Sequence, residues 1–324
     1  MNVGILTAVG LVTAVLAALV YAREWFARLD TEAVSRTSEQ LLENPASVEK
    51  VPAPSVFSEV TKSLSIVVPA FNEEARLPAT LDETLLYLQR RRDRKGPTFT
   101  YEVVIVDDGS TDATVRVAME YVRRHGFDAV RVMRLPANRG KGAAVKAGML
   151  AARGEALLMM DADGATQVRD LERLEAALAR VVKNGLGIAV GSRAHLQAAA
   201  TAKRSWYRNL LMRGFHLLVV LVAGSGVKDT QCGFKLFTRA AARRLYPSQR
   251  LQRWCFDVEL LLLAQALGVP VVETSVTWTE IPGSKIKVTS IIHMAWELAA
   301  LLLAYQVLGI WTVLSDVQVA RVAS

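Results

Sequence analysis

Five carboxylates follow three short apolar runs of this chain. The runs 66–69, 103–106 and 157–160 consist almost entirely of Val, Ile, Leu and Met, as buried strands do. The acidic residues after them are Glu73, Asp107, Asp108, Asp161 and Asp163. In open α/β sheets, ligands bind at the carboxyl ends of the strands, so these side chains are expected in one crevice. Clustered carboxylates repel one another, and the crevice is therefore predicted to hold a cation or a ligand that presents hydrogen-bond donors.

Asp161 and Asp163 are the candidate metal ligands. They are two positions apart, so both side chains leave on one face if the backbone there is still extended. Mg²⁺ and Mn²⁺ prefer oxygen ligands and are commonly held by one or two carboxylates together with substrate phosphates. An isolated Asp-X-Asp is also typical of a solvated turn. Its place after an apolar strand, beside two other acidic strand ends, favours a site for Mg²⁺ or Mn²⁺.

The loop 138–142, with the sequence NRGKG, is a candidate phosphate-binding segment. It is not a dinucleotide fingerprint, because Val145 stands where the third glycine is needed. This broken glycine pattern and the acidic strand ends together exclude a nicotinamide oxidoreductase. The segment is not a Walker A loop, because Gly142 follows Lys141 where Ser or Thr is required. A plain helix start explains the same residues. A basic loop that opens a helix nevertheless suits a pyrophosphate, with Lys141 as a donor-binding residue.

Composition points to anionic partners. The formal net charge of +8 at pH 7 favours phosphate, nucleotide or acidic membrane lipid, although such a charge also serves solubility. No nucleic-acid partner is predicted. The two cysteines, Cys232 and Cys255, match neither zinc spacing nor a disulfide framework, which is in keeping with a reducing compartment.

Short apolar runs alternate with charged amphipathic stretches between residues 63 and 190. Helices are expected at Leu81–Arg94 and Leu171–Lys183. The expected strands are Ser65–Pro69, Tyr101–Val106, Ala129–Leu135, Ala156–Met160 and Leu186–Val190. This alternation predicts one α/β domain with a mostly parallel, Rossmann-like sheet and helices on both faces.

The N-terminal segment 3–22 carries no charge and is long enough to cross a bilayer. A cleaved signal peptide is the alternative, since residues 20–22 resemble a cleavage site, but no Lys or Arg precedes the apolar run. Arginines follow the segment at 23, 28 and 36, so the positive-inside rule places the rest of the chain in the cytosol. We therefore expect a single-pass transmembrane anchor at 1–22 and a linker or stalk at 23–62.

Two apolar helices are expected in the second half of the chain, at Ser205–Ala223 and Ser290–Leu314. Both could be core helices, and Leu298–Leu314 is marginally long enough to be a second span. Their edges are rich in arginine, tryptophan and tyrosine, which favours helices at the membrane interface. The expected division is a catalytic domain at 63–285, which includes the helix 205–223, and a C-terminal interface helix and tail at 286–324.

Four motifs together resemble the inverting GT-A glycosyltransferases that use polyprenyl phosphates. They are VVPAFNEE at 67–74, VVIVDDGSTD at 103–112, NRGKG at 138–142 and DADG at 161–164. The segments GSRAHL, DTQCGFKLF, RWCFDVELL and TEIPGSK are similar to the glucose-transferring branch of that family. The resemblance covers residues 63 to 290. It implies transfer of glucose from UDP-glucose to dolichyl phosphate with inversion, at the endoplasmic reticulum membrane, for protein N-glycosylation.

The resemblance also implies roles for individual residues. Asp161, Ala162 and Asp163 match the metal and diphosphate motif, and Arg193 and Lys285 match basic positions near the phosphates. Arg204, with Arg208 one turn later, occupies a position where acceptor phosphate is expected. The positions that match donor-binding residues are Pro69, Phe71, Glu73, Val106 and Asp108, with Asp107 beside them.

Two departures from the family pattern restrict the chemistry. Ala165 stands where mannosyl relatives often carry a metal-binding Gln, so coordination must be completed otherwise. Arg250 replaces the Gln of the Gln-X-X-Arg-Trp motif of processive members, which argues against a polymer synthase. The alternatives are a mannosyl or undecaprenyl-phosphate enzyme and an inactive nucleotide-sugar scaffold. The scaffold is disfavoured because Asp161 and Asp163 are both present.

Overall fold

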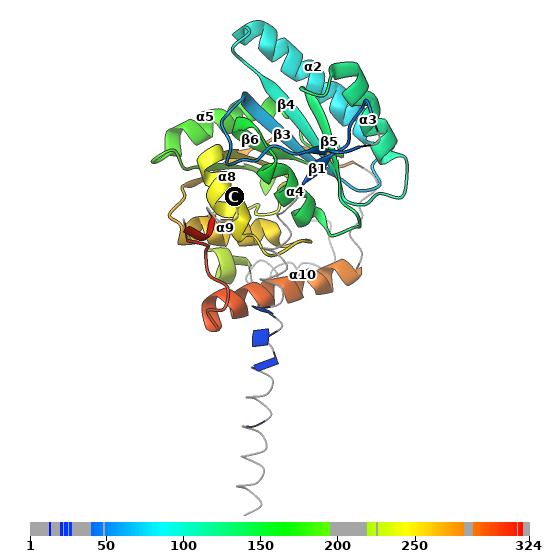
Figure 1. Cartoon of the computed structure of the whole chain (residues 1–324). Helices are drawn as coiled ribbons and strands as arrows, with labels where there is room; N and C mark the ends of the chain where they lie inside the picture. Colours follow the sequence, from blue (N-terminus) through cyan, green and yellow to red (C-terminus); the bar gives the residue numbers. More distant parts are fainter. Residues whose placement is uncertain are drawn as a thin grey trace, which may run out of the picture.

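The computed structural model describes residues 13, 20–21, 23–24, 26–27, 40–47, 49–194, 219–224, 226–281, 288–315 and 317–319. Within them, one sheet has the order β2-β1-β5-β4-β3-β6-β8-β7-β9 (Figure 1). Its strands are β1 (Leu41–Leu42), β2 (Val51–Pro52), β3 (Lys62–Ala70), β4 (Tyr101–Asp107), β5 (Val130–Arg134), β6 (Gly154–Met160), β7 (Ile188–Ser192), β8 (Phe234–Thr238) and β9 (Val271–Ser275).

The centre of the sheet is parallel, as predicted. Strand β3 pairs in parallel with both β4 and β6, and β4 pairs in parallel with β5. Beyond β6, strand β8 is antiparallel to both of its neighbours, β6 and β7. All five strands expected from the sequence are present, with bounds shifted by up to three residues. Four further strands were not expected: β1, β2, β8, whose segment 234–238 was read only as part of a motif, and β9.

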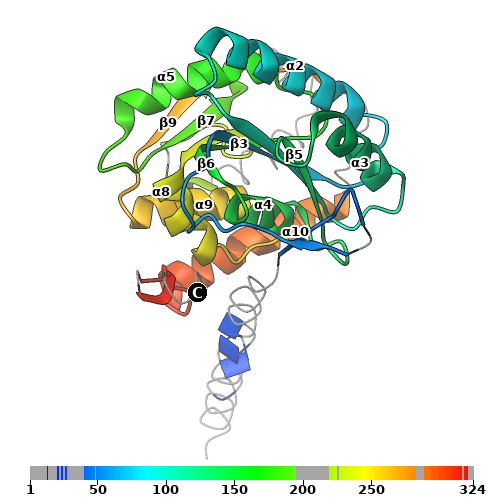
Figure 2. The same cartoon turned by 45° about the horizontal axis from the view of Figure 1, so that its top comes forward.

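Helices cover both faces of the sheet, which confirms the prediction (Figures 1 and 2). One face is covered by α2 (Leu77–Lys95), α3 (Thr114–His125) and α5 (Leu171–Val181). The other is covered by α4 (Lys141–Leu150), α8 (Arg239–Leu245) and α9 (Phe256–Ala266). Side chains alternate between the two cores, as a pleated strand requires: Ile66 and Val68 face α2, whereas Val67 faces α4.

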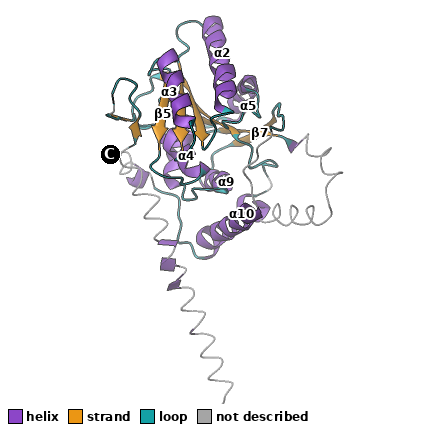
Figure 3. Cartoon of the chain, turned by 90° about the vertical axis from the view of Figure 1, so that its right-hand side faces the viewer, coloured by secondary structure: helices purple, strands orange, loops and turns teal. Residues whose placement is uncertain are grey.

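The helix α10 (Val288–Leu301) lies outside α9 as a further layer (Figure 3). A π-helical turn at Leu302–Val307 continues it, and Gly309 has a positive φ of 59°. The helix therefore ends before Leu314, the end predicted from the sequence. Trp311, which we expected at a membrane interface, is buried against Phe26 and donates a 3.1 Å hydrogen bond from Nε1 to its carbonyl.

Part of the predicted linker belongs to the catalytic domain. Residues 41–42 and 51–52 pair with each other, and Leu42 pairs with Met133 of β5. Val56 is completely buried, and Arg239 donates hydrogen bonds to the carbonyls of Ser55 and Ser58. The expected anchor at 3–22 falls almost wholly outside the described residues. Among the residues that are described, no helix combines the length and the apolar character needed to span a membrane.

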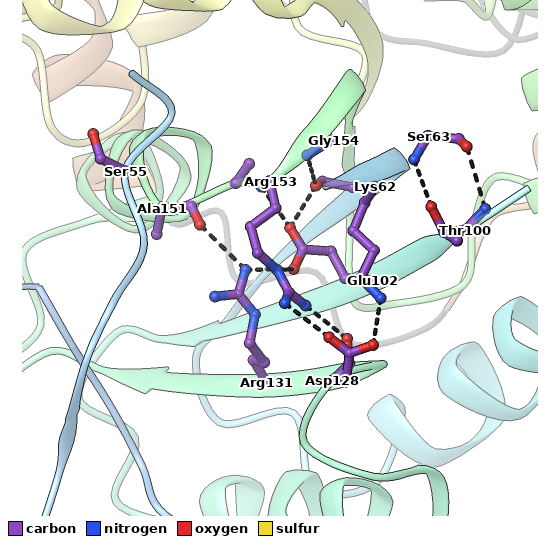
Figure 4. A network of polar contacts seen from close by, with 12 residues as sticks. Ser55, Lys62, Ser63, Thr100, Glu102, Asp128, Arg131, Ala151, Arg153 and Gly154 are labelled. Carbon is purple, nitrogen blue, oxygen red and sulfur yellow. Dashed lines mark hydrogen bonds and ion pairs between the residues drawn. The ribbon is translucent and has the colours of Figure 1, made fainter. Parts of the chain in front are cut away.

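A buried ionic network joins the amino-terminal ends of the central strands, opposite the acidic strand ends (Figure 4). Glu102 on β4 is completely buried. Its carboxylate accepts hydrogen bonds from Ser65 Oγ (2.6 Å), from the backbone N–H of Arg153 (2.7 Å), and from the guanidinium groups of Arg131 (2.5 Å) and Arg153 (2.7 Å). Burial lowers the pKa of Arg131, and the charge of Glu102 opposes that shift. The network thus depends on the negative charge of Glu102.

We expect Glu102→Gln to lower the free energy of unfolding by about 2 kcal/mol, because two arginines then lose their charged acceptor. The measurement is chemical denaturation followed by circular dichroism. Asp128→Asn is the matched control, since the Asp128 side chain is 74% exposed and exposed ion pairs contribute under about 1 kcal/mol. If both variants lost the same free energy of unfolding, the buried charge of Glu102 would contribute no more than the exposed charge of Asp128.

Candidate active site

The three acidic strand ends lie at one edge of the sheet. Ala70, the last residue of β3, pairs with Asp107, and Val67 pairs with Met159 near the end of β6. The segments that carry Glu73, Asp108 and Asp161 therefore leave the sheet side by side. The sequence prediction that these carboxylates converge on one edge is confirmed by this register.

Among the described residues of the site, the carboxylate of Asp161 is contacted by Lys141 and that of Asp163 by Ala165. Asp161 Oδ1 is buried and, within the described part of the chain, accepts no hydrogen bond of regular geometry; the Lys141 ammonium lies 2.6 Å away. Asp163 Oδ1 accepts a 3.0 Å hydrogen bond from the N–H of Ala165. Burial and the neighbouring charge of Asp161 raise the pKa of Asp163. A cation between the two would relieve that repulsion.

These two carboxylates fit a divalent cation. Their oxygens are the hard ligands that Mg²⁺ and Mn²⁺ take, and the contact of buried Asp161 Oδ1 with a described residue is the ion pair with Lys141. No third acidic, histidine or cysteine side chain joins them in a metal-binding group among the described residues. Phosphate oxygens of a substrate and water would therefore have to complete the coordination.

Lys141 approaches from the first position of α4. Gly140 precedes it with φ +106°, and a Cβ there would lie 2.5 Å from the carbonyl oxygen of Gln252. Asp108 holds this turn, because its two oxygens accept the N–H groups of Arg139 (2.7 Å) and Gly140 (2.8 Å). Burial raises the pKa of Asp108, although these hydrogen bonds oppose the shift. Asp108 therefore positions the loop that carries Lys141.

The other predicted donor-binding positions lie on β3, on β4 or in the segments that follow β3, β4 and β6. Two of their carboxylates already bind other groups of the protein. The Glu73 carboxylate is bound by Arg76 at 2.6 and 2.7 Å, and the Asp107 carboxylate accepts the N–H of Ser110. Val106 is completely buried in the core, where it pairs with Pro69 of β3 and Met133 of β5. Pro69 and Ala162 are buried and Phe71 is half-buried. The structure thus brings these positions to the site edge, with Asp107 and Glu73 bound to protein partners.

Arg193 is held in place by Asp229. Its Nε and NH2 donate to the two oxygens of Asp229 at 2.8 Å, and its backbone N–H donates to the same carboxylate. Its guanidinium also lies over the ring of Trp278, 5.6 Å from the centroid. Hydrogen bonds to Asp229 raise the pKa of Arg193, against the effect of burial, and the charge of Asp161 adds to the rise. Arg193 therefore stays charged near Asp161, one of the two candidate metal ligands.

A second row of charges lies behind the site and was missed in the sequence. Lys235 of β8 and Asp257 of α9 form a fully buried ion pair of 2.5 Å, and Lys235 also donates to the carbonyl of Cys232. Glu297 of α10 accepts the N–H groups of Trp254 and Cys255, which precede α9. Acidic residues within an otherwise apolar helix, as in FDVELLLL at 256–263, were the available signal, since buried charges require partners.

Three predicted phosphate-binding residues lie outside the described residues. They are Arg204, Arg208 and Lys285. Their roles stay predictions.

Sequence comparisons relate the chain to glycosyltransferases. The model of glycosyl transferase family 2 matches residues 65–246. The dolichyl-phosphate beta-glucosyltransferase of Homo sapiens is 50% identical over 256 residues, which cover 78% of this chain and 79% of the human protein. The protein of the same name from Saccharomyces cerevisiae is 38% identical over 260 residues, which cover 76% of each chain.

Structural comparison shows the fold. Glucosyl-3-phosphoglycerate synthase from Mycobacterium tuberculosis in complex with UDP has a TM-score of 0.52 at 18% identity, covering 75% of this chain and 79% of that one. The structure of that synthase with Mn²⁺ and UDP-glucose has a TM-score of 0.51 at 16% identity, covering 79% and 81%. At these identities the similarity shows a shared GT-A fold.

Proposed function

This chain belongs to glycosyl transferase family 2, among its dolichyl-phosphate β-glucosyltransferases, and we propose that it transfers glucose from UDP-glucose to dolichyl phosphate with inversion. Membership rests on the matches reported above. The structural observation that carries the proposal is the cluster of Asp161, Asp163 and Lys141 at the carboxyl edge of the sheet. Two neighbouring carboxylates, one of them paired with a lysine ammonium, suit a metal-bound diphosphate.

The proposed reaction is a single displacement at the anomeric carbon. An oxygen of the acceptor phosphate forms the new bond to that carbon as the bond to UDP breaks, so an α-linked donor gives a β-linked product. Asp161 and Asp163 would hold Mg²⁺ or Mn²⁺, which neutralises charge on the departing diphosphate. Lys141 and Arg193 add fixed positive charge to the same region. A phosphate monoester is mostly dianionic at pH 7, so no protein side chain has to remove a proton from it.

Donor competition tests this function. Purified full-length protein in detergent is given dolichyl phosphate with labelled UDP-glucose, UDP-galactose or GDP-mannose. We expect label in the lipid fraction with UDP-glucose, and a β-configured product by NMR. Asp163→Asn serves as the inactive control. Preference for GDP-mannose would reject the glucosyl proposal in favour of the mannosyl alternative.

The proposed acceptor requires a site at the membrane surface, and α10 suits this position. Among the described side chains of α10 and the π-helical turn after it, Ile292, Trp296, Leu303 and Val307 are apolar and exposed, at spacings typical of one helix face. We propose that this face lies on the bilayer and that the segment 3–22 anchors the chain in the endoplasmic reticulum membrane, with the catalytic domain in the cytosol. Protease added to sealed microsomes should then digest the domain without detergent. Protection of the domain would reject this topology.

Arg204 is our candidate for binding the acceptor phosphate, because a guanidinium can grip phosphate with two parallel hydrogen bonds. We expect Arg204→Ala to raise the apparent KM for dolichyl phosphate or lower turnover, while UDP-glucose binding without acceptor changes little. Arg204→Lys should recover part of the loss. If Arg204→Ala weakened membrane association but left activity on a short, soluble prenyl phosphate unchanged, Arg204 would be a lipid headgroup contact instead.

A further inference from the structure

The backbone of Lys141 is fixed, whereas its side chain can move. Asp108 binds the two N–H groups before it, and the carbonyl of Gly142 after it accepts a 3.0 Å hydrogen bond from Gln249 Nε2. The side chain reaches from the start of α4 to the end of β6 and is 32% exposed. A lysine ammonium on a flexible four-carbon chain can exchange partners without any change in this backbone.

Lys141 is the counter-ion of Asp161. Within the described part of the chain, no other cationic group forms an ion pair with Asp161. The nearby cations have partners of their own: Arg193 is bound to Asp229, and Lys235 is bound to Asp257. The lysine side chain is ordinarily protonated at neutral pH, so the 2.6 Å contact with Asp161 is an ion pair.

A divalent cation on Asp161 and Asp163 competes with this ammonium for the same carboxylate. The ammonium contacts Asp161 Oδ1 at 2.6 Å, so a cation bound to that oxygen would lie within a few ångströms of it and repel it. The ammonium can leave Asp161 at low cost when a diphosphate offers new anionic oxygens. Metal binding thus displaces the Lys141 ammonium from Asp161 and makes it available to the diphosphate. Transfer of the ammonium to the diphosphate in turn leaves Asp161 available to the metal.

We propose that Lys141 is an exchangeable internal counter-ion, which pairs with Asp161 in the free enzyme and transfers to the donor diphosphate when a divalent cation binds. The assignment of the diphosphate rests on the proposed function. Metal alone then binds weakly, and metal and UDP bind with positive cooperativity. Because coupling is reciprocal, UDP tightens metal binding by the same factor by which metal tightens UDP binding.

The test measures Mn²⁺ affinity, from the electron paramagnetic resonance signal of free Mn²⁺, with and without UDP. In the wild type we expect UDP to tighten Mn²⁺ binding at least tenfold. In Lys141→Met, Mn²⁺ alone should bind at least tenfold more tightly than in the wild type, and the effect of UDP should shrink. Lys141→Arg keeps the charge and should keep weak binding of Mn²⁺ alone. Lys228→Met, at an exposed position, controls for loss of one positive charge.

Unchanged or weaker binding of Mn²⁺ alone in Lys141→Met would overturn the proposal, as would an equal gain in Lys228→Met. Tighter binding of Mn²⁺ alone that is confined to Lys141→Met supports the counter-ion role whatever the donor. If UDP failed to bind the wild type in the presence of Mn²⁺, the proposed donor would be wrong, while the metal measurements would still decide the role of Lys141.

Discussion

Replacing Asp163 by Asn is expected to lower turnover by two to three orders of magnitude and leave the fold intact, a loss typical of groups that stabilise developing charge. Asn keeps an oxygen that can accept the N–H of Ala165, so the turn after β6 should persist. What is lost is the negative charge that, with Asp161, would hold the divalent cation. Turnover at saturating UDP-glucose and dolichyl phosphate measures the effect, and circular dichroism checks the fold.

The matched control for this change is Asp93→Asn, which removes one exposed carboxylate of α2 far along the chain from the site. It should retain wild-type turnover. EDTA should abolish wild-type activity, and added Mg²⁺ or Mn²⁺ should restore it. Full activity of Asp163→Asn, or of the wild type without divalent cations, would show that the Asp161–Asp163 pair is not a metal site.

The central strands and their acidic ends could be predicted from the sequence because both signals are local. A strand such as 154–160 is an apolar run, and Asp161 follows it directly. The position of these ends at one edge then follows from the general rule for parallel sheets. The antiparallel strand β8 could not be predicted in the same way, because its pairing with β6 depends on a return of the chain across some 70 residues.

The partners of the site residues also lay beyond local patterns. Arg193 was singled out, but its partner Asp229 is 36 positions away, and Glu297 reaches back 42 positions to Cys255. Trp311 was expected at a membrane interface because tryptophan is enriched there, yet it packs against Phe26, 285 positions earlier. Each of these contacts forms only when distant segments pack together. The composition of the segment around a residue therefore does not predict its partner.

Gly233 is a residue whose importance for the site follows from the structure alone. It precedes β8 and lies against the end of β6, where its carbonyl accepts a 3.1 Å hydrogen bond from the N–H of Asp161. A Cβ on Gly233 would overlap the carboxylate of Asp161 itself. The Asp161 side chain is 36% exposed, so it can turn away into solvent and does not have to distort the sheet.

Gly233→Ala is therefore expected to fold but to lose at least a hundredfold in turnover, because the displaced Asp161 carboxylate could no longer share the proposed cation with Asp163. Mn²⁺ affinity in the presence of UDP should fall in parallel, which separates a metal-site defect from a general loss of stability. Gly226→Ala is the control, since a Cβ at Gly226 meets no atom of the described residues within 4 Å. Turnover within fivefold of the wild type, in a Gly233→Ala protein with unchanged circular dichroism, would show that the position of Asp161 is not critical. A loss of turnover with unchanged Mn²⁺ affinity would instead assign Asp161 a role apart from the metal.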